Sequence, residues 1–227
     1  MTKAQRILHH LELPILLLVP IVMAISALSS SDFTGGLTLL AALVCCGFLF
    51  EEVERERPTL RQIMPTVCLG ALAAAGRILF AAIPDVKPVS AIVILAGACL
   101  GPRYGFVTGA LAALVSNMFF GQGAWTPLQM YAWGLIGYIA GVLAAHHLLD
   151  KRWQLAIAGF LSGLLFGLIL NGWYILGYVR PLTWATAGIA FAAGIPFDIV
   201  HGIATAGFLL LIWIPWGRSL RRVLARF

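Results

Sequence analysis

The chain has 227 residues, of which 61% are hydrophobic and only 11% are charged, and its mean hydropathy is +0.95. Soluble domains are about 45–50% apolar, so this composition excludes an ordinary soluble domain and predicts an integral membrane protein. Helices of about 20 residues with short loops allow seven or eight crossings at this length and leave no room for a separate soluble domain. The formal net charge of +6 is spread between apolar segments, which argues against a nucleic-acid-binding surface.

Apolar runs bounded by charged residues or by Gly and Pro predict the helices in chain order. The fourth run is short for a full crossing, so we expect a half-length or strongly tilted helix that ends at Gly101-Pro102. The predicted helices lie near 13–30, 36–50, 62–83, 89–101, 104–120, 127–148, 153–178 and 186–214.

The strongly polar segment 51–61 divides these runs into two parts. We therefore expect an all-α integral membrane protein with about eight transmembrane segments, in which a two-helix N-terminal hairpin precedes a six-helix core. The expected parts are a transmembrane hairpin at 1–50, a cytoplasmic polar linker at 51–61, the substrate-binding membrane core at 62–217 and a basic cytoplasmic tail at 218–227.

The basic residues set the expected orientation. With both termini in the cytoplasm, twelve lysines and arginines lie inside and only Lys87 and Arg180 lie outside, while Arg77 lies within a helix. This asymmetry follows the positive-inside rule and favours an even number of crossings. The twelve inner residues are Lys3, Arg6, Arg55, Arg57, Arg61, Arg103, Lys151, Arg152, Arg218, Arg221, Arg222 and Arg226.

In this orientation the polar and aromatic residues gather in the outer half of the protein. An ionisable residue at the bilayer centre costs about 2.5–3.5 kcal/mol and usually faces the bundle interior or a wet cavity, which applies to Arg77, Asp198 and His201. Asp198 and His201 share one helix face, where two roles are open: pairing with each other or with Arg77, or direct contact with a ligand. Aromatics interleaved with Asn, Gln, Lys and Arg suit a large, partly planar, polar ligand. For any single tryptophan, an interfacial aromatic belt is the alternative.

Other function classes receive less support from the sequence. No lysine follows a glycine, so the chain has no GxxxxGK[ST] phosphate loop, and any ATP hydrolysis belongs to a partner. An intramembrane enzyme that uses Ser162 with His146, His147 or His201 has no recognised motif, and we expect no catalytic and no metal-ligating residues. A secondary transporter coupled to protons through Asp198 and His201 stays open as an alternative.

Small residues recur at helical spacing in the predicted core, as in Gly105/Gly109, Gly137/Gly141 and Gly159/Gly163. Such faces allow close contact between helices. The contact is either within this chain or with another membrane protein.

Residues 75–141, and most specifically VKPVSAIVI and FFGQGAWTP, resemble the substrate-binding S components of energy-coupling factor (ECF) transporters. The segments LNGWYIL and GIPFDIVHG are similar to later parts of the same group, whereas the N-terminal hairpin departs from the usual six-helix plan. The resemblance implies high-affinity capture of a vitamin outside a prokaryotic plasma membrane. It also implies partners, namely a membrane scaffold subunit (T component) and two cytoplasmic ATPase subunits. The family's docking motif for the scaffold maps approximately to Ala71 and Ala75.

The resemblance further implies an outer cavity covered by the loops that hold Lys87, Gln122 with Trp125, and Arg180 with Trp184. These are the loops that the depth of the polar residues indicates independently. The residues predicted to bind substrate are Arg77, Lys87, Asn117, Gln122, Trp125, Gln129, Trp133, Asn171, Tyr174, Arg180, Trp184, Asp198 and His201.

Among S components the chain is most similar to the cobalamin-specific ones, so the expected bound substrate is cobalamin. A smaller vitamin, a queuosine precursor or another heterocycle is the alternative, and we expect no intrinsic cofactor. If cobalamin binds, His201 as a cobalt ligand is one option. Recognition of the corrin by its amide rim is the favoured one.

Overall fold

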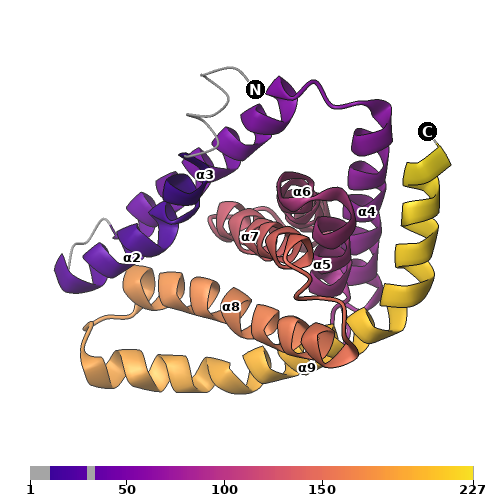
Figure 1. Cartoon of the computed structure of the whole chain (residues 1–227). Helices are drawn as coiled ribbons and strands as arrows, with labels where there is room; N and C mark the ends of the chain where they lie inside the picture. Colours follow the sequence, from indigo (N-terminus) through magenta and orange to yellow (C-terminus); the bar gives the residue numbers. More distant parts are fainter. Residues whose placement is uncertain (1–10, 30–33, 227) are drawn as a thin grey trace.

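The computed structural model describes residues 11–29 and 34–226, and every regular element in that part of the chain is an α-helix, as predicted (Figure 1). Helices fill most of the apolar runs identified above, and the loops between them are short. The helices are α2 (Leu18–Ser29), α3 (Thr34–Arg55), α4 (Leu60–Leu79), α5 (Val89–Leu100), α6 (Pro102–Phe120), α7 (Trp125–Ala145), α8 (Arg152–Tyr178) and α9 (Trp184–Arg226).

Five of these helices, α3, α4, α7, α8 and α9, are long and apolar enough to cross a membrane. Two shorter ones, α2 and α5, are also apolar. Large side chains such as Leu40, Leu72, Leu168 and Leu211 are exposed on the surface of the bundle. Because exposed leucines in this number need lipid rather than water around them, the chain is a multi-pass membrane protein.

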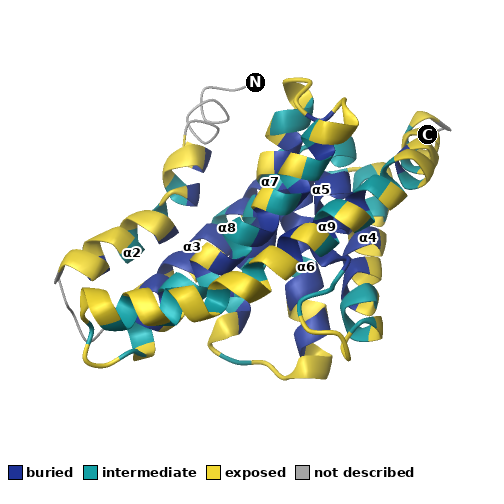
Figure 2. Ribbon diagram, turned by 90° about the horizontal axis from the view of Figure 1, so that it is seen from below, coloured by how far each residue is buried: buried dark blue, intermediate teal, exposed yellow. Residues whose placement is uncertain are grey.

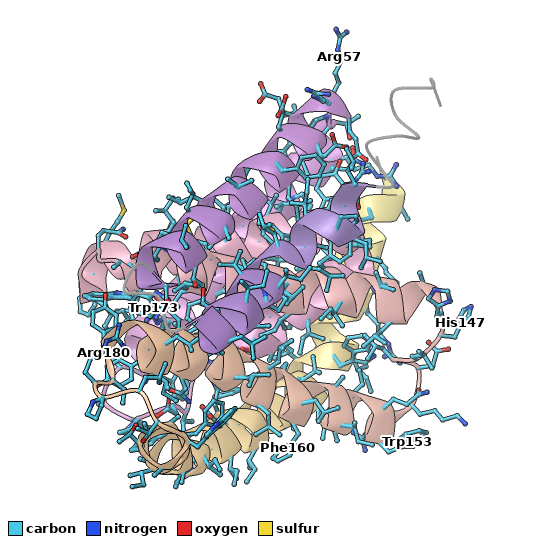
Figure 3. All side chains as sticks on the ribbon, turned by 90° about the vertical axis from the view of Figure 1, so that its left-hand side faces the viewer. Arg57, His147, Trp153, Phe160, Trp173 and Arg180 are labelled. Atoms are coloured by element: carbon cyan, nitrogen blue, oxygen red, sulfur yellow. The ribbon has the colours of Figure 1, made fainter. Side chains whose placement is uncertain are left out.

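Helix α8 joins the two ends of the bundle. Figure 3 shows Trp173 and Arg180 at one end and His147 and Trp153 at the opposite end. The first pair lies in the half predicted to face outward and the second in the half predicted to face the cytoplasm. Lys3 and Arg6, which contribute to that orientation, lie outside the described residues.

Two helix boundaries follow from backbone chemistry, and two others differ from the bounds that the sequence predicted. The short fourth run forms the 12-residue α5, which ends at Gly101, whose φ of 101° a side chain would strain. Pro102 then opens α6, where its missing N–H costs nothing. At its end α3 extends to Arg55, so its last turn lies within the expected polar linker. The helix α9 continues through Pro215 to Arg226, so the expected basic tail is helical that far.

The centre of the bundle is α5, which packs against α4, α6, α7 and α9. Nearly all of its side chains are buried, and Figure 2 shows it enclosed by its neighbours. Glycines allow α5 and α6 to lie close to α7. A Cβ on Gly97 of α5 would lie 2.0 Å from the Gly137 carbonyl oxygen of α7, and a Cβ on Gly105 of α6 would lie 2.5 Å from the same oxygen. The glycine stripes of α6 and α7 therefore serve packing within the chain, one of the two roles that the spacing allowed.

The N-terminal hairpin is docked on the core rather than separate from it. Helix α3 packs against α6, α7 and α8, where Cys46 and Leu49 share an apolar cluster with Phe106 and Ile169. Two hydrogen bonds from core side chains reach the hairpin backbone. Tyr131 donates to the Leu16 carbonyl at 2.7 Å, and Trp173 donates to the Gly35 carbonyl at 3.2 Å.

A charged clamp joins the hairpin to the inner end of the core. Arg103 of α6 forms ion pairs with Glu12 and Glu56, and Glu52 lies 3.7 Å from it. Tyr138 donates to Glu12 at 2.7 Å, and Tyr104 likewise donates to Glu56 at 3.1 Å. Since Glu12 and Glu52 are both buried, their charges need partners of this kind.

Candidate functional site

The outer half of the core is organised around Arg77, in the last turn of α4. Its Nη1 donates to Ser116 Oγ at 2.7 Å and to Asn117 Oδ1 at 2.6 Å, and both acceptors are fully buried on α6. These acceptors are neutral, and no ion pair to Arg77 occurs in the part of the chain that the structure describes. The guanidinium therefore brings a positive charge into the bundle without a carboxylate to balance it.

Two aromatic rings stabilise this cation in place of an acid. The guanidinium carbon lies 4.7 Å from the centroid of Phe120 and 5.0 Å from that of Trp133. Contacts of this kind contribute about 0.5–2 kcal/mol, more where water is excluded. The site thus combines a guanidinium with flat aromatic surfaces.

An amide network extends from Arg77 to the loop between α6 and α7. Asn117 Nδ2 donates to Thr126 Oγ1 at 3.0 Å and to Gln129 Oε1 at 2.8 Å. Thr126 in turn donates to Gln122 Oε1 at 3.0 Å. Gln122 also donates to the Leu114 carbonyl at 2.9 Å, which ties the loop back onto α6. The chain therefore presents donors and acceptors from the loop down to the arginine.

A second chain of contacts continues inward from Trp133. Its indole N–H donates to Ser90 Oγ at 3.1 Å, and Ser90 Oγ lies 3.0 Å from His201 Nε2. Phe166 stacks on Trp133 with centroids 4.6 Å apart and meets the His201 ring edge-on at 5.2 Å. Trp133, Ser90 and His201 are all buried. This chain joins α5, α7, α8 and α9 beneath the arginine.

Pairing among Asp198, His201 and Arg77 was one of the two roles left open, and in the structure each of the three has other partners. Asp198 accepts a hydrogen bond from Asn171 of α8 at 3.0 Å, whereas His201 is bonded to Ser90 of α5. The two residues share a face of α9, as predicted, but different helices lie opposite them. A cobalt-ligand role for His201 through Nε2 would require that atom to leave Ser90.

Lys87 lies in the loop between α4 and α5 and stabilises the end of α4. Its ammonium donates to the carbonyls of Phe80 and Ile83, each at 2.5 Å. A cation at this position complements the negative end of the helix dipole. Burial lowers the pKa of Lys87, against the opposing effect of Asp85, and burial raises the pKa of Asp85 against that of Lys87.

Four predicted site residues lie at the surface, outside this network. The Trp125 ring covers Gly123 and is 42% exposed, and Tyr174 stacks on Tyr178 at 5.9 Å. Arg180 donates to the Val179 carbonyl at 2.9 Å, and Trp184 is 93% exposed. The aromatic-belt interpretation therefore stays open for Trp184.

Three hydroxyl residues of the site, Ser90, Ser116 and Thr126, were not predicted from the sequence, and neither were the aromatic residues Phe120 and Phe166. Ser90 had one signal, since it is the only hydroxyl residue in the apolar run of α5. Ser116 precedes Asn117, and Thr126 follows Trp125, so both were adjacent to predicted residues. Single hydroxyl groups often bond to their own helix, as Ser162 does with Gly159 at 2.7 Å. The sequence does not distinguish such a hydroxyl group from one that bonds to another helix.

Comparison with known proteins decides the family. The model of the ECF transporter, substrate-specific component family matches residues 61–213, about two thirds of the chain. The chain belongs to this family. Neither the comparison with curated proteins nor that with solved structures found a match.

The matched region of this S component begins in the first turn of α4 and ends within α9. It contains every residue of the outer network and excludes the hairpin helices α2 and α3. The protein is therefore a substrate-specific transport subunit rather than an enzyme. The described residues contain no group of three or more His, Cys, Asp or Glu side chains suited to a metal ion.

Proposed function

We propose that this S component captures cobalamin or a related corrinoid from the outer side of a prokaryotic cell membrane with high affinity. It would then deliver the vitamin through a T component driven by two ATPase subunits. The observation that supports this proposal best is Arg77, a guanidinium held by neutral partners beside Phe120 and Trp133. Such a group is suited to an anionic or strongly polar part of a ligand.

The chemistry of the network suits the parts of a corrinoid. Primary amides around the corrin ring match the amides of Asn117, Gln122 and Gln129, because each can donate and accept hydrogen bonds. The phosphodiester of cobalamin is an acceptor for a guanidinium. A broad, flat ring system matches aromatic faces.

A smaller vitamin with an acidic group and a planar ring would use the same contacts, and it is the second candidate. The two candidates differ in size, and size decides how far the side chains near the loop have to change their hydrogen bonds. In this structure the Gln122 amide bonds to Thr126 and to the Leu114 carbonyl. A large ligand has to replace the bonds that Gln122 makes to Thr126 and Leu114. Gln122 is exposed, so this exchange needs no rearrangement of the buried helices.

Docking of the scaffold subunit has a candidate surface on α4. Ala71 and Ala75 are both exposed, whereas Ala73 and Ala74 are buried against the core. A small-residue surface facing lipid allows another helix to approach closely. This supports the docking position that the family resemblance implies.

The experiment is calorimetric titration of the detergent-purified chain, alone, with cobalamin and with a panel of smaller vitamins. Tight one-to-one binding of cobalamin without ATPase subunits is the expected result. Binding of only a smaller vitamin would replace the corrinoid but keep the capture role. Substrate uptake by the chain alone in proteoliposomes, driven by a proton gradient, would instead favour a secondary transporter.

A further inference from the structure

Two adjoining cavities lie at the inner end of the bundle, opposite to the Arg77 network. Their volumes are about 250 Å³ and about 230 Å³, and both are lined by Asp150, Trp213 and Arg221. The first lies between the start of α8 and the last part of α9, and the second reaches α5 at Cys99. The connection between α7 and α8, residues 146–151, forms their shared border.

The first cavity carries an excess of positive charge. Arg152, Arg218 and Arg221 line it, against one carboxylate, Asp150. Asp150 is already 3.1 Å from Nδ1 of His147. Among the described residues, no hydrogen bond or ion pair engages any of the three guanidinium groups. The first turn of α8 adds the positive end of a helix dipole.

The remaining wall of this cavity is apolar. Leu155, Leu210 and Ile214 line it together with Trp213. Ile214 is 45% exposed and its neighbour Leu211 is 72% exposed, so the apolar wall continues into the surface that faces lipid. Tryptophan commonly occupies the level of the lipid headgroups. The cavity therefore has a cationic part beside an apolar part that opens to the bilayer.

We propose that these cavities bind the headgroup of an anionic phospholipid, with its phosphate against Arg152, Arg218 and Arg221 and its upper acyl chain along Leu210 and Ile214. Basic pockets between transmembrane helices on the cytoplasmic side bind acidic lipid headgroups in this way. A free phosphate ion shares the anionic chemistry but has no use for the apolar wall. An acidic segment of a protein would likewise leave that wall uncovered.

The test is native mass spectrometry of the full-length chain in detergent, titrated with phosphatidylglycerol and, separately, with phosphatidylcholine. The variant is the double substitution Arg152→Gln and Arg221→Gln. Arg222→Gln is the matched control, since Arg222 is exposed, adjacent to Arg221 and lines neither cavity. All three positions are exposed, so the fold survives the changes, and unaltered thermal unfolding checks this.

We expect phosphatidylglycerol to bind more tightly than phosphatidylcholine, with a loss of about fivefold in affinity for each arginine removed. Arg222→Gln should retain the wild-type preference, and millimolar inorganic phosphate should not displace the lipid.

Equal binding of the two lipids, or wild-type affinity in the double variant, would overturn the proposal. Displacement by inorganic phosphate would show a site for a free anion instead. If the arginines affect only association with the partner subunits, the surface is a protein contact and the lipid proposal fails.

Discussion

Two arginines at opposite ends of the bundle differ in how their charge is balanced. Arg103, at the inner end, faces three carboxylates, those of Glu12, Glu52 and Glu56. Arg77, towards the outer end, bonds to the neutral oxygens of Ser116 and Asn117 and lies beside aromatic rings. Both charges are partly removed from water, but among the residues that the structure describes only the charge of Arg103 is compensated by acids.

The difference separates a structural role from a binding role. A buried cation with carboxylate partners completes its own environment and joins the segments that carry those partners. A cation held only by neutral dipoles keeps its capacity to attract an anion, and ionisable residues inside membranes commonly mark substrate sites. The inner arginine therefore fastens the hairpin, and in the proposed function the outer arginine recognises the substrate.

The largest expected effect is on stability at the inner end. Arg103→Ala removes the Arg103 cation from the buried carboxylates of Glu12 and Glu52, and breaking a buried pair costs about 3–5 kcal/mol of unfolding free energy. Titration of the detergent-solubilised protein with sodium dodecyl sulfate measures this change. Arg57→Ala, an exposed arginine in the same region, is the control and should cost almost nothing. A stability loss equal to that of the control would break the comparison.

A smaller loss is expected where the outer network continues inward. Ser90→Ala removes the partner of both the Trp133 indole and His201, at about 1–3 kcal/mol for buried polar groups left unsatisfied. Ser162→Ala is a matched control, because Ser162 is also buried but bonds to Gly159 of its own helix. Equal stability of the two variants would mean that the Trp133–Ser90–His201 chain contributes nothing to the fold.

Arg77→Gln should cost less stability than Arg103→Ala, because no carboxylate among the described residues loses an ion pair. We expect about 1–2 kcal/mol, because the lost hydrogen bonds and cation–π contacts are partly offset by removing a charge from the bundle, measured in the same detergent titration. A loss as large as that of Arg103→Ala would show that Arg77 is a structural residue after all. That result would remove the contrast between the two ends.

The smallest effects are expected at the loop that covers the network. Gln122→Ala and Trp125→Ala should each weaken substrate binding about fivefold, equivalent to roughly 1 kcal/mol, without changing expression. Gln154→Ala and Trp153→Ala make the same replacements at the inner end and should leave binding unchanged. Wild-type affinity in both loop variants would exclude the loop from the site.

The helices were largely predictable from the sequence, because a segment that crosses lipid has to be apolar and has to satisfy its backbone hydrogen bonds internally, as a helix does. Apolar runs of sufficient length became helices, and the short run before Gly101 became the short helix α5. The course of α9 was less predictable. Its apolar run was expected to end near residue 214, but the helix passes Pro215 and continues through the basic segment, since Pro need not end a helix that is supported by packing.

The site was predictable only in part. The sequence indicated which residues were unusual for their depth, and the structure joins Arg77, Asn117, Gln122 and Gln129 in one network. It did not indicate which partners they choose, because those depend on which helix lies opposite. The inner clamp was missed for the same reason. From the sequence, Arg103 was only one of the basic residues that set the orientation. Its partner Glu12 lies 91 positions away in the sequence.

The central claim, that the unbalanced charge of Arg77 belongs to the substrate site, is tested most directly by calorimetric titration with cobalamin. The titration compares the wild type with Arg77→Gln, with Arg61→Gln as the control at the other end of the same helix. The account predicts that Arg77→Gln loses at least about 30-fold in affinity, as expected when one partner of a hydrogen-bonded charge pair is removed, whereas Arg61→Gln binds like the wild type. Tight binding by the wild type together with equal affinity in both variants would contradict it.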